Sequence, residues 1–287
     1  MIDLALAIAA TTGIAVVLRL ARHFNRTIEV VIAMNYVVAA LLGIALAITT
    51  GGPVSVEPVT VLMAVGGGPF WPGAFYLYAW GIATFGIART GAWARLSLLL
   101  PVLVGLVFLG EALSGRLLVG VLLLFVAFAA LTPASAPVNT PAENPSGRPR
   151  TLWFAAALIV VFGLIDAWIS IFNEVGSGQD QIFFAILFGT AATVSWVAVF
   201  ARRVEVRIPD ILTGIALGVL NFGVSWFLLQ AIAGGFENRS AIAFTLFSAG
   251  SLVIMVVIGR VVWHEQVRGR ELAGVAAAIV AIVALNL

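Results

Sequence analysis

An acidic residue inside a long apolar run is the first candidate for chemistry in this chain. Asp166 lies in the run from Phe162 to Ser170, and of the 13 acidic residues it alone falls deep inside an apolar segment. Because an ionisable side chain costs about 2.5–3.5 kcal/mol at the centre of a membrane helix, it is expected to face a cavity or a partner. Asp166 is therefore a candidate for binding a proton or for balancing the charge of a cationic substrate. The alternative is a carboxylate that is hydrogen-bonded to a neighbouring helix and serves packing alone.

Two further polar positions lie near the ends of apolar runs. Arg95 lies about one turn inside the run that begins near residue 91. It either binds an anionic group or extends along the helix to the membrane surface, and the sequence favours the surface. Asn35 and Tyr36 lie early in the run from 30 to 49. They either line a pore or satisfy hydrogen bonds near the membrane interface.

A cluster of helix-breaking residues interrupts the run from 59 to 86. The segment from Gly66 to Gly73 holds two prolines and four glycines in eight residues, which predicts a broken or kinked helix. The freed carbonyls need partners, so we expect them to line protein or a wet cavity, as broken helices do in many transporters. A kink for close packing through small residues is the alternative. The matching stretch, Gly218–Gly223, has no proline, so the break is expected in the first half only.

Aromatic and polar residues follow each of these glycine-rich stretches. Tyr76 and Trp80 are four residues apart and share a helix face, as do Trp226 and Gln230. Facing one another across a repeat, they would form an aromatic-walled pocket for a planar or cationic ligand. Lipid-interface belts or plain packing are equally good interpretations.

Hydroxyl groups recur with helical spacing at Thr245, Ser248 and Ser251, where they either line the substrate path or bond backbone carbonyls. Asn221 matches Trp71 in the repeat described below. The candidate substrate-binding residues are therefore Asn35, Tyr36, Trp71, Tyr76, Tyr78, Trp80, Arg95, Asn221, Trp226 and Gln230.

The composition restricts the class of protein that these residues can belong to. The chain has 287 residues, 62% hydrophobic and 10% charged, with a mean hydropathy of +1.14. This leaves too little polar surface for a water-soluble globule. There is no cysteine, and the two histidines are far apart; all 15 basic residues are arginine and are spread over many loops. We therefore expect an integral membrane protein that is not an enzyme, with no cofactor, metal site or nucleic-acid partner.

Apolar runs between short charged breaks predict an all-α protein with ten transmembrane helices. A segment with proline at every fourth position, 133–150, is predicted to be a non-helical linker between a first repeat of five spans, 1–132, and a second of five spans, 151–287. The predicted spans are 2–20, 30–49, 59–86, 91–110, 117–132, 152–173, 181–200, 211–233, 240–262 and 272–287.

The two halves resemble each other. At a shift of 150 residues Gly68 matches Gly218 and Gly73 matches Gly223. At a shift of 154 the segments that begin at Glu111 and at Glu265 share the pattern E-x-x-x-G-R-x-L-x-G-V. We interpret the two glutamates as structural residues of tight helix turns. Internal repeats of this kind are a known basis of transporter folds.

The distribution of arginine predicts the orientation in the membrane. Of the 15 arginines, all but Arg116 and Arg239 lie in the loops after the odd-numbered spans. Since cytoplasmic loops retain arginine, those loops should be cytoplasmic and both termini outside. Five spans per repeat also invert the second half relative to the first.

A family resemblance rests on the run from Leu99 to Arg116, which contains Pro101, and on the opening segment with Met34-Asn35-Tyr36. The first resembles the hallmark of the drug/metabolite transporter superfamily, EamA type, and the second is similar to bacterial EamA/RhaT-like members. The resemblance implies ten spans and transport of small metabolites such as amino acids, sugars and amphipathic cations. The chain departs from the family in two respects: Ser251 stands where a second proline would lie, and members are described with cytoplasmic termini.

We therefore expect a multi-pass protein of a bacterial inner membrane with two inverted five-helix repeats. It would move a small metabolite, amino acid-like, aromatic or an amphipathic cation, by alternating access, with Asp166 as the candidate for coupling to protons. A passive channel or lipid scramblase is the alternative, and a membrane enzyme acting on lipid-linked substrates is a weaker one. Its expected partners are the substrate and the bilayer. One copy of the chain is sufficient, and a dimer is an alternative.

Overall fold

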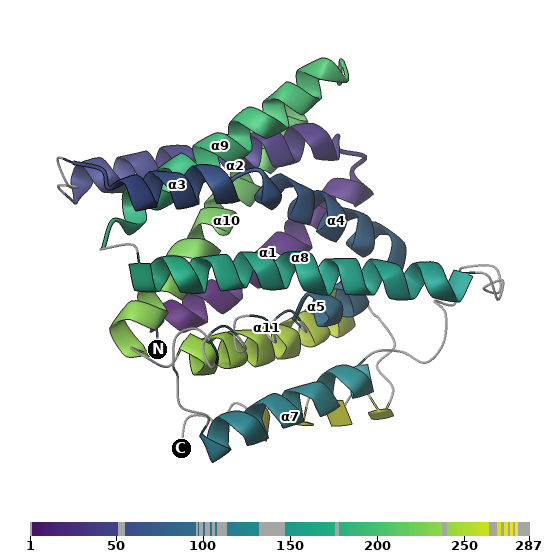
Figure 1. Ribbon diagram of the computed structural model, residues 1–287. Coiled ribbons are helices and arrows are strands. Elements are labelled where there is room, and N and C mark those ends of the chain that lie inside the picture. Colours follow the sequence, from purple (N-terminus) through teal and green to yellow (C-terminus); the bar gives the residue numbers. More distant parts are fainter. Residues whose placement is uncertain are drawn as a thin grey trace. The chain divides into compact units, whose positions relative to one another are not determined.

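The computed structural model describes most of the chain, and every regular element in the described part is a helix (Figure 1). The described residues are 2–50, 55–95, 97, 100, 104, 107, 114–131, 147–175, 178–236, 240–263, 269–270, 273–274, 276–277 and 279–280. The helices are α1 (Ile2–His23), α2 (Ile28–Thr49), α3 (Pro58–Gly67), α4 (Phe70–Phe85), α5 (Ile87–Arg95), α7 (Gly115–Leu131), α8 (Gly147–Val175), α9 (Asp180–Ala201), α10 (Ile208–Gly235) and α11 (Ser240–Val262).

Six of these helices are long and apolar enough to cross a membrane, which identifies a membrane-embedded, multi-pass helical protein. Each overlaps one span predicted from the sequence. They are Ile2–His23, Ile28–Thr49, Trp153–Val175, Asp180–Ala201, Ile208–Gly235 and Ile242–Val262. The predicted spans at 91–110 and 272–287 are described only in part, so the count of ten spans stays a prediction.

The predicted break in the third span is present. Helix α3 ends at Gly67, a turn follows at Gly68 and Pro69, and α4 begins at Phe70, whereas the matching α10 is continuous. A Cβ on Gly68 would lie 2.8 Å from the backbone oxygen of Leu187 in α9. The break therefore allows the close packing through small residues that the sequence left as the alternative.

The end of the predicted non-helical linker is helical. Helix α8 begins at Gly147, so the last four residues of the segment 133–150 are helical and the prediction is wrong for them. Pro149 lies in the first turn of α8, where its missing N–H has no intrahelical partner to lose. Residues 133–146 lie outside the described residues.

The chain divides into two compact units, and each unit takes residues from both halves of the sequence. Unit 1 comprises Met1–Trp80 and Trp168–Ala233, and unit 2 comprises Gly81–Ala167 and Gly234–Leu287. This division into units differs from the predicted division into repeats at the linker. The repeat boundaries themselves stay a prediction.

In unit 1 the helices α2 and α9 pack against each other in antiparallel directions. A Cβ on Gly43, near the end of α2, would lie 2.8 Å from the backbone nitrogen of Ala185, near the start of α9. Val30 and Ala33, near the start of α2, share a core cluster with Val199, near the end of α9. The two contacts fix the direction of the pair.

Helix α10 crosses α2 through two glycines that are four residues apart. A Cβ on Gly214 would lie 2.8 Å from the backbone oxygen of Val31, and a Cβ on Gly218 would lie 2.6 Å from that of Asn35. Small residues at this spacing let helix backbones approach closely. The polar positions of α2 and α10 are therefore held near each other by backbone contact.

In unit 2 the helix α5 packs against α11 and α7. A Cβ on Gly91 of α5 would meet the sulfur of Met255 at 2.7 Å. Rings of Phe85, Trp93 and Phe154 form a three-way aromatic contact with centroids 5.1–6.1 Å apart. Offset and edge contacts of this kind stabilise helix packing beyond their buried area.

The glycine contacts give a matched pair of substitutions. Gly218→Ala should destabilise the protein by about 1–3 kcal/mol, because the new methyl group meets the backbone of α2 and the helices must separate. Gly189→Ala, at a position of α9 with nothing within 4 Å of the added Cβ, should be neutral or stabilising. Thermal unfolding in detergent measures both, and equal melting temperatures for the two variants would contradict the packing.

Candidate functional site

The carboxylate of Asp166 is part of a polar contact in unit 2. The hydroxyl of Ser97 donates a hydrogen bond of 2.9 Å to Oδ2 of Asp166. Gly163, one turn earlier on the same face of α8, makes this possible, because a Cβ there would lie 3.0 Å from the backbone oxygen of Ser97 and 2.9 Å from the Cβ of Leu100. A small residue thus brings the segment after α5 against the acid.

Arg95 brings a positive charge to the same place. Its side chain is 6% exposed, and its guanidinium carbon lies 4.9 Å from the centroid of the Phe247 ring. Its charge also attracts the carboxylate of Asp166. The expectation that Arg95 extends to a surface is therefore wrong, since its guanidinium is buried beside an aromatic ring inside the unit.

Buried hydroxyl groups lie on α5 and α11 in the same unit. Thr245, Ser248 and Ser251 are all buried, and the hydroxyl of Ser251 donates a 3.1 Å hydrogen bond to the backbone oxygen of Ser248. This is the backbone-bonding role that the sequence left as one of two alternatives. The hydroxyl of Thr90 in α5 is buried and has no hydrogen-bond partner among the residues that the structure describes.

Unit 1 holds a second polar centre, at the crossing of α2 and α10. Asn35 is fully buried, and neither its amide nitrogen nor its amide oxygen has a hydrogen-bond partner within the described residues. Asn221 lies one turn beyond Gly218 on α10, is 4% exposed, and has an unpartnered amide nitrogen within the same part of the chain. Leaving such groups unpaired costs about 1–3 kcal/mol each, so they are suited to binding a polar ligand.

The aromatic candidates belong to a continuous stack in unit 1. The ring of Tyr36 contacts Phe75 of α4 and Phe188 of α9, with centroids 5.8 and 6.1 Å away. Phe188 stacks on Phe184, which in turn contacts Phe222 of α10, the ring on which Trp226 stacks. The first and second halves are thus joined by packed rings. An aromatic-walled pocket stays a prediction.

The remaining candidates differ in exposure. Trp71 and Tyr78 are buried, Tyr76 is half-buried and Trp80 is 53% exposed, so the shared face of Tyr76 and Trp80 stays a prediction. Gln230 is half-buried in the last part of α10.

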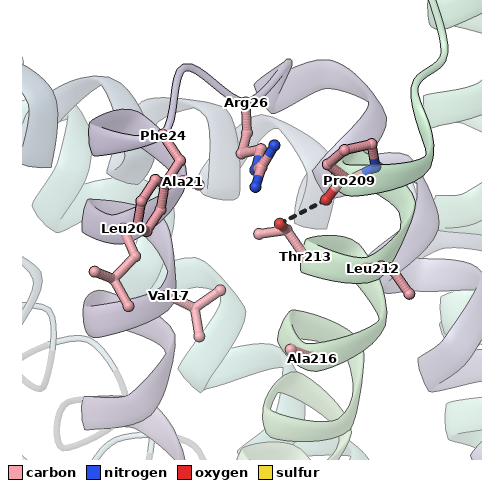
Figure 2. A pocket seen from close by; sticks show the side chains of 9 residues that line it. All are labelled: Val17, Leu20, Ala21, Phe24, Arg26, Pro209, Leu212, Thr213 and Ala216. Carbon is pink, nitrogen blue, oxygen red and sulfur yellow. Dashed lines mark hydrogen bonds between the residues drawn. The ribbon is translucent and has the colours of Figure 1, made fainter.

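A groove of about 370 Å³ lies in unit 1 between α1 and the start of α10 (Figure 2). Its walls are apolar, and one arginine lies at the end nearest the loop. It is lined by Val17, Leu20, Ala21, Phe24, Arg26, Pro209, Leu212, Thr213 and Ala216. None of these residues is a candidate from the sequence.

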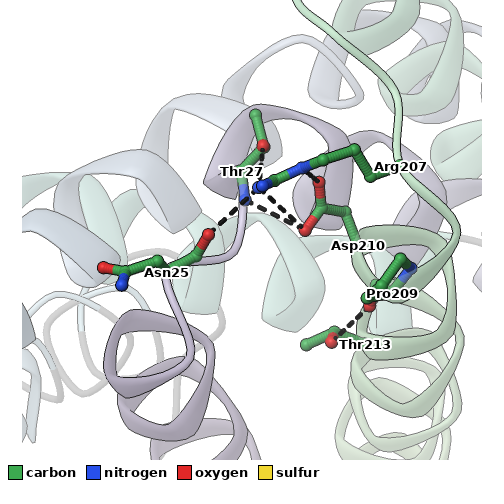
Figure 3. A network of polar contacts seen from close by, with 6 residues as sticks. All are labelled: Asn25, Thr27, Arg207, Pro209, Asp210 and Thr213. Carbon is green, nitrogen blue, oxygen red and sulfur yellow. Dashed lines mark hydrogen bonds and ion pairs between the residues drawn. The ribbon is translucent and has the colours of Figure 1, made fainter.

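A polar network that the sequence does not predict joins the α1–α2 loop to the start of α10 (Figure 3). Asp210 is fully buried, pairs with the Nε of Arg207 at 3.0 Å, and accepts a 3.2 Å hydrogen bond from the backbone N–H of Thr27. Arg207 also donates to the backbone oxygen of Asn25 and to the hydroxyl of Thr27, at 3.0 and 2.8 Å. The Arg-x-x-Asp spacing at a helix start is the one signal of it in the sequence.

A second network of the same kind precedes α9. The side-chain amide of Gln179 donates to the backbone oxygen of Ser55 at 3.1 Å and accepts from the backbone N–H of Glu57 at 3.0 Å. It joins the start of α9 to the start of α3. Both networks lie at loops, where buried backbone groups need such partners.

The comparisons with known proteins concern the whole chain. No family model matches it. The chain is 27% identical over 298 residues to an uncharacterised protein of Haemophilus influenzae, covering 99% of this chain and 97% of that relative. It is also similar to a solved crystal structure, with a TM-score of 0.73 at 18% identity, covering 99% of this chain and 98% of that one. The helical fold is therefore shared with a solved protein over nearly the whole length.

The attraction between the charges of Arg95 and Asp166 in unit 2 predicts non-additive changes in stability. Arg95→Gln and Asp166→Asn should each destabilise the protein, because each leaves the other charge without compensation. The double variant should cost less than the sum, with a coupling of about 0.5–3 kcal/mol. Thermal unfolding of the wild type, the two single variants and the double variant measures this coupling. As a control, Arg95→Gln combined with Glu205→Gln, at an exposed loop position, should be additive; additivity in both cycles would refute the pairing.

The unpaired amide in unit 1 predicts a stabilising substitution. Asn35→Leu should raise the free energy of unfolding of the ligand-free protein by about 1–3 kcal/mol, because an unpaired buried amide is replaced by an apolar group of similar size. Gln179→Leu is the matched control, since this buried amide is bonded through both of its polar atoms and its loss should destabilise. A lower melting temperature for Asn35→Leu would show that the amide is already paired.

Proposed function

We propose that the chain is a secondary transporter that moves a small metabolite across a bacterial inner membrane by alternating access. The observation that carries this proposal is the contact of Asp166 with Ser97 and the charge of Arg95 inside apolar helices. Ionisable groups are costly at such positions, and by default they indicate a substrate or proton pathway. An interior that served packing alone would be cheaper without charges.

The chemistry of this contact suits coupling. When Asp166 binds a proton, its attraction for Arg95 falls, and the guanidinium becomes available to an anionic group of the substrate. When the proton leaves, the carboxylate recovers its bond with Ser97 and its attraction for Arg95. One titrating carboxylate thereby biases two arrangements of α5 and α8, which is the requirement for a switch.

The polar centre in unit 1 supplies neutral hydrogen-bonding groups. Asn35 offers both a donor and an acceptor, and Asn221 offers a donor. Together with the ring of Tyr36 they suit a ligand with a polar head and an aromatic or apolar body. This favours an amino acid-like, aromatic or amphipathic cationic metabolite as substrate.

Helix boundaries support two repeats of five spans within ten spans in total. The pair α3 and α4 runs from Pro58 to Phe85 and α10 runs from Ile208 to Gly235, a shift of 150 at both ends. Helices α2 and α9 are both 22 residues long. Unit 2 begins at Gly81 in the first half and again at Gly234 in the second, a separation between the two sequence shifts of 150 and 154.

The contacts within unit 1 support inversion of one repeat. The equivalent helices α2 and α9 run antiparallel, as inverted copies must. The loop networks follow the same relation. Thr27 precedes α2 and is bonded to the first turn of α10, and Gln179 precedes α9 and is bonded to the segment before α3. Because α2 and α9 are antiparallel, the two networks lie at opposite ends of the pair.

This architecture agrees with membership of the drug/metabolite transporter superfamily, EamA type, which we propose on the sequence patterns around Pro101 and Asn35. The arginine-rich loops after the odd-numbered spans support cytoplasmic placement of those loops, with both termini outside. The repeat makes one copy of the chain sufficient for a complete transport path.

Transport in proteoliposomes tests the proposal. Full-length protein is screened for a rise in melting temperature with L-tryptophan and with benzyltrimethylammonium, and the stabilising probe is then offered under an imposed pH gradient. Wild type should accumulate the probe above equilibrium. Asp166→Asn should still bind the probe, but its accumulation of the probe should no longer depend on pH, because an asparagine side chain does not titrate.

Other outcomes select the alternatives. Equilibration without accumulation would indicate a passive channel, and flipping of labelled lipid without probe uptake would indicate a scramblase. Uptake by Asp166→Asn with the wild-type rate and pH dependence would remove the coupling role. Ser97→Ala is the matched control, since it deletes one hydrogen bond and keeps both charges; it should shift the pH dependence without abolishing it.

A further inference from the structure

The groove between α1 and α10 combines two properties that no part of the proposed transport path uses. Its walls are formed by apolar side chains that are partly exposed, with Leu20 at 40%, Phe24 at 57% and Leu212 at 61%. Figure 2 shows Arg26 at the loop end, with its guanidinium between the two helices. An apolar trough that ends in one positive charge matches the polarity of an acyl chain with an anionic headgroup.

Arg26 is not neutralised within the described part of the chain. Its guanidinium lies over the Phe24 ring, with the guanidinium carbon 5.7 Å from the ring centroid. The buried acid nearest in the loop network, Asp210, is already paired with Arg207 and with the backbone of Thr27. That network holds the loop in place and leaves the charge of Arg26 available to an outside anion.

The surroundings favour a negative headgroup. The two chain segments at this end of the groove, 19–29 and 202–210, carry six arginines against three acidic residues, Glu29, Glu205 and Asp210, so they are net positive. Basic positions between membrane helices at the arginine-rich face recruit anionic lipid headgroups, and each arginine near the surface adds to the attraction. The hydroxyl of Thr213 is bonded to the backbone oxygen of Pro209 at 2.8 Å, so it presents its methyl group to the trough.

We propose that this groove binds one anionic phospholipid, with an acyl chain along Val17, Leu212 and Ala216 and the phosphate at Arg26. The site is independent of the transport proposal, because it needs only that α1 and α10 lie in a bilayer. Its occupant ties the end of α1 to the start of α10, and its effect is on stability.

The test uses full-length protein purified in detergent, with dioleoylphosphatidylglycerol as the probe and dioleoylphosphatidylcholine as the uncharged-headgroup comparison. Wild type should gain about 4 °C in Tm from the anionic lipid over the zwitterionic one. Arg26→Gln should lose this gain because the phosphate loses its cation. Ala216→Phe, at an exposed position of the groove, should lose it because the trough is filled.

Arg22→Gln is the matched control, since Arg22 is exposed and does not line the groove; it should keep the full gain. Native mass spectrometry counts the phosphatidylglycerol retained by each variant, which separates loss of binding from a variant that is less stable throughout. Inorganic phosphate should give no gain, because the acyl contribution is missing. An equal gain with phosphatidylcholine or phosphate, or a full gain in Arg26→Gln, would overturn the proposal.

Discussion

A carboxylate can stay among apolar helices only where the protein supplies hydrogen bonds and an opposite charge. In this chain that requirement shapes unit 2. Gly163 removes the side chain that would keep α8 away from the segment after α5, so the hydroxyl of Ser97 reaches Asp166. Arg95 supplies the opposite charge and is itself covered by the ring of Phe247. The contacts around these two charged residues thus join α8, the end of α5 with the segment after it, and α11.

Unit 1 meets the same physical constraint in a different way. Two loops of unit 1 pair the buried side chains of Asp210 and Gln179, whereas Asn35 and Asn221 at the helix crossing keep unpartnered amide atoms within the described residues. A fold that pairs its loop groups so closely has no need to leave two amides unpaired for packing. Unpartnered amides on two helices that cross are expected of a site that completes its hydrogen bonds with a ligand.

The sequence predicted the features that depend on local pattern. Long apolar runs predict the six membrane helices, and the prolines and glycines around residue 69 predict the break between α3 and α4. It also selected Asp166, because an acid in an apolar run needs no knowledge of its neighbours to be unusual. The proline pattern predicts a start of α8 that is too late, because the first turn of a helix tolerates proline.

Features that depend on distant partners could not be predicted in the same way. Spacing alone placed Arg95 at a surface, since the sequence does not reveal that Phe247, far along the chain, covers it. The bond between Ser97 and Asp166 joins residues 69 positions apart, and that between Thr27 and Asp210 joins residues 183 apart. Glycine contacts such as Gly218 with Asn35 decide which residues meet, and a single sequence does not state which glycine faces which helix.

The central claim is that the charged contact in unit 2 belongs to a path that water reaches during the cycle. Because the chain has no cysteine, Ser97→Cys places a single thiol at this contact. The most direct measurement is its labelling in proteoliposomes by a charged methanethiosulfonate, against Leu122→Cys on the exposed face of α7 as a lipid-facing control. Labelling at position 97 and none at position 122 would support the claim. A folded protein whose Ser97→Cys thiol stays unlabelled at every pH would mean that the contact is dry and only structural.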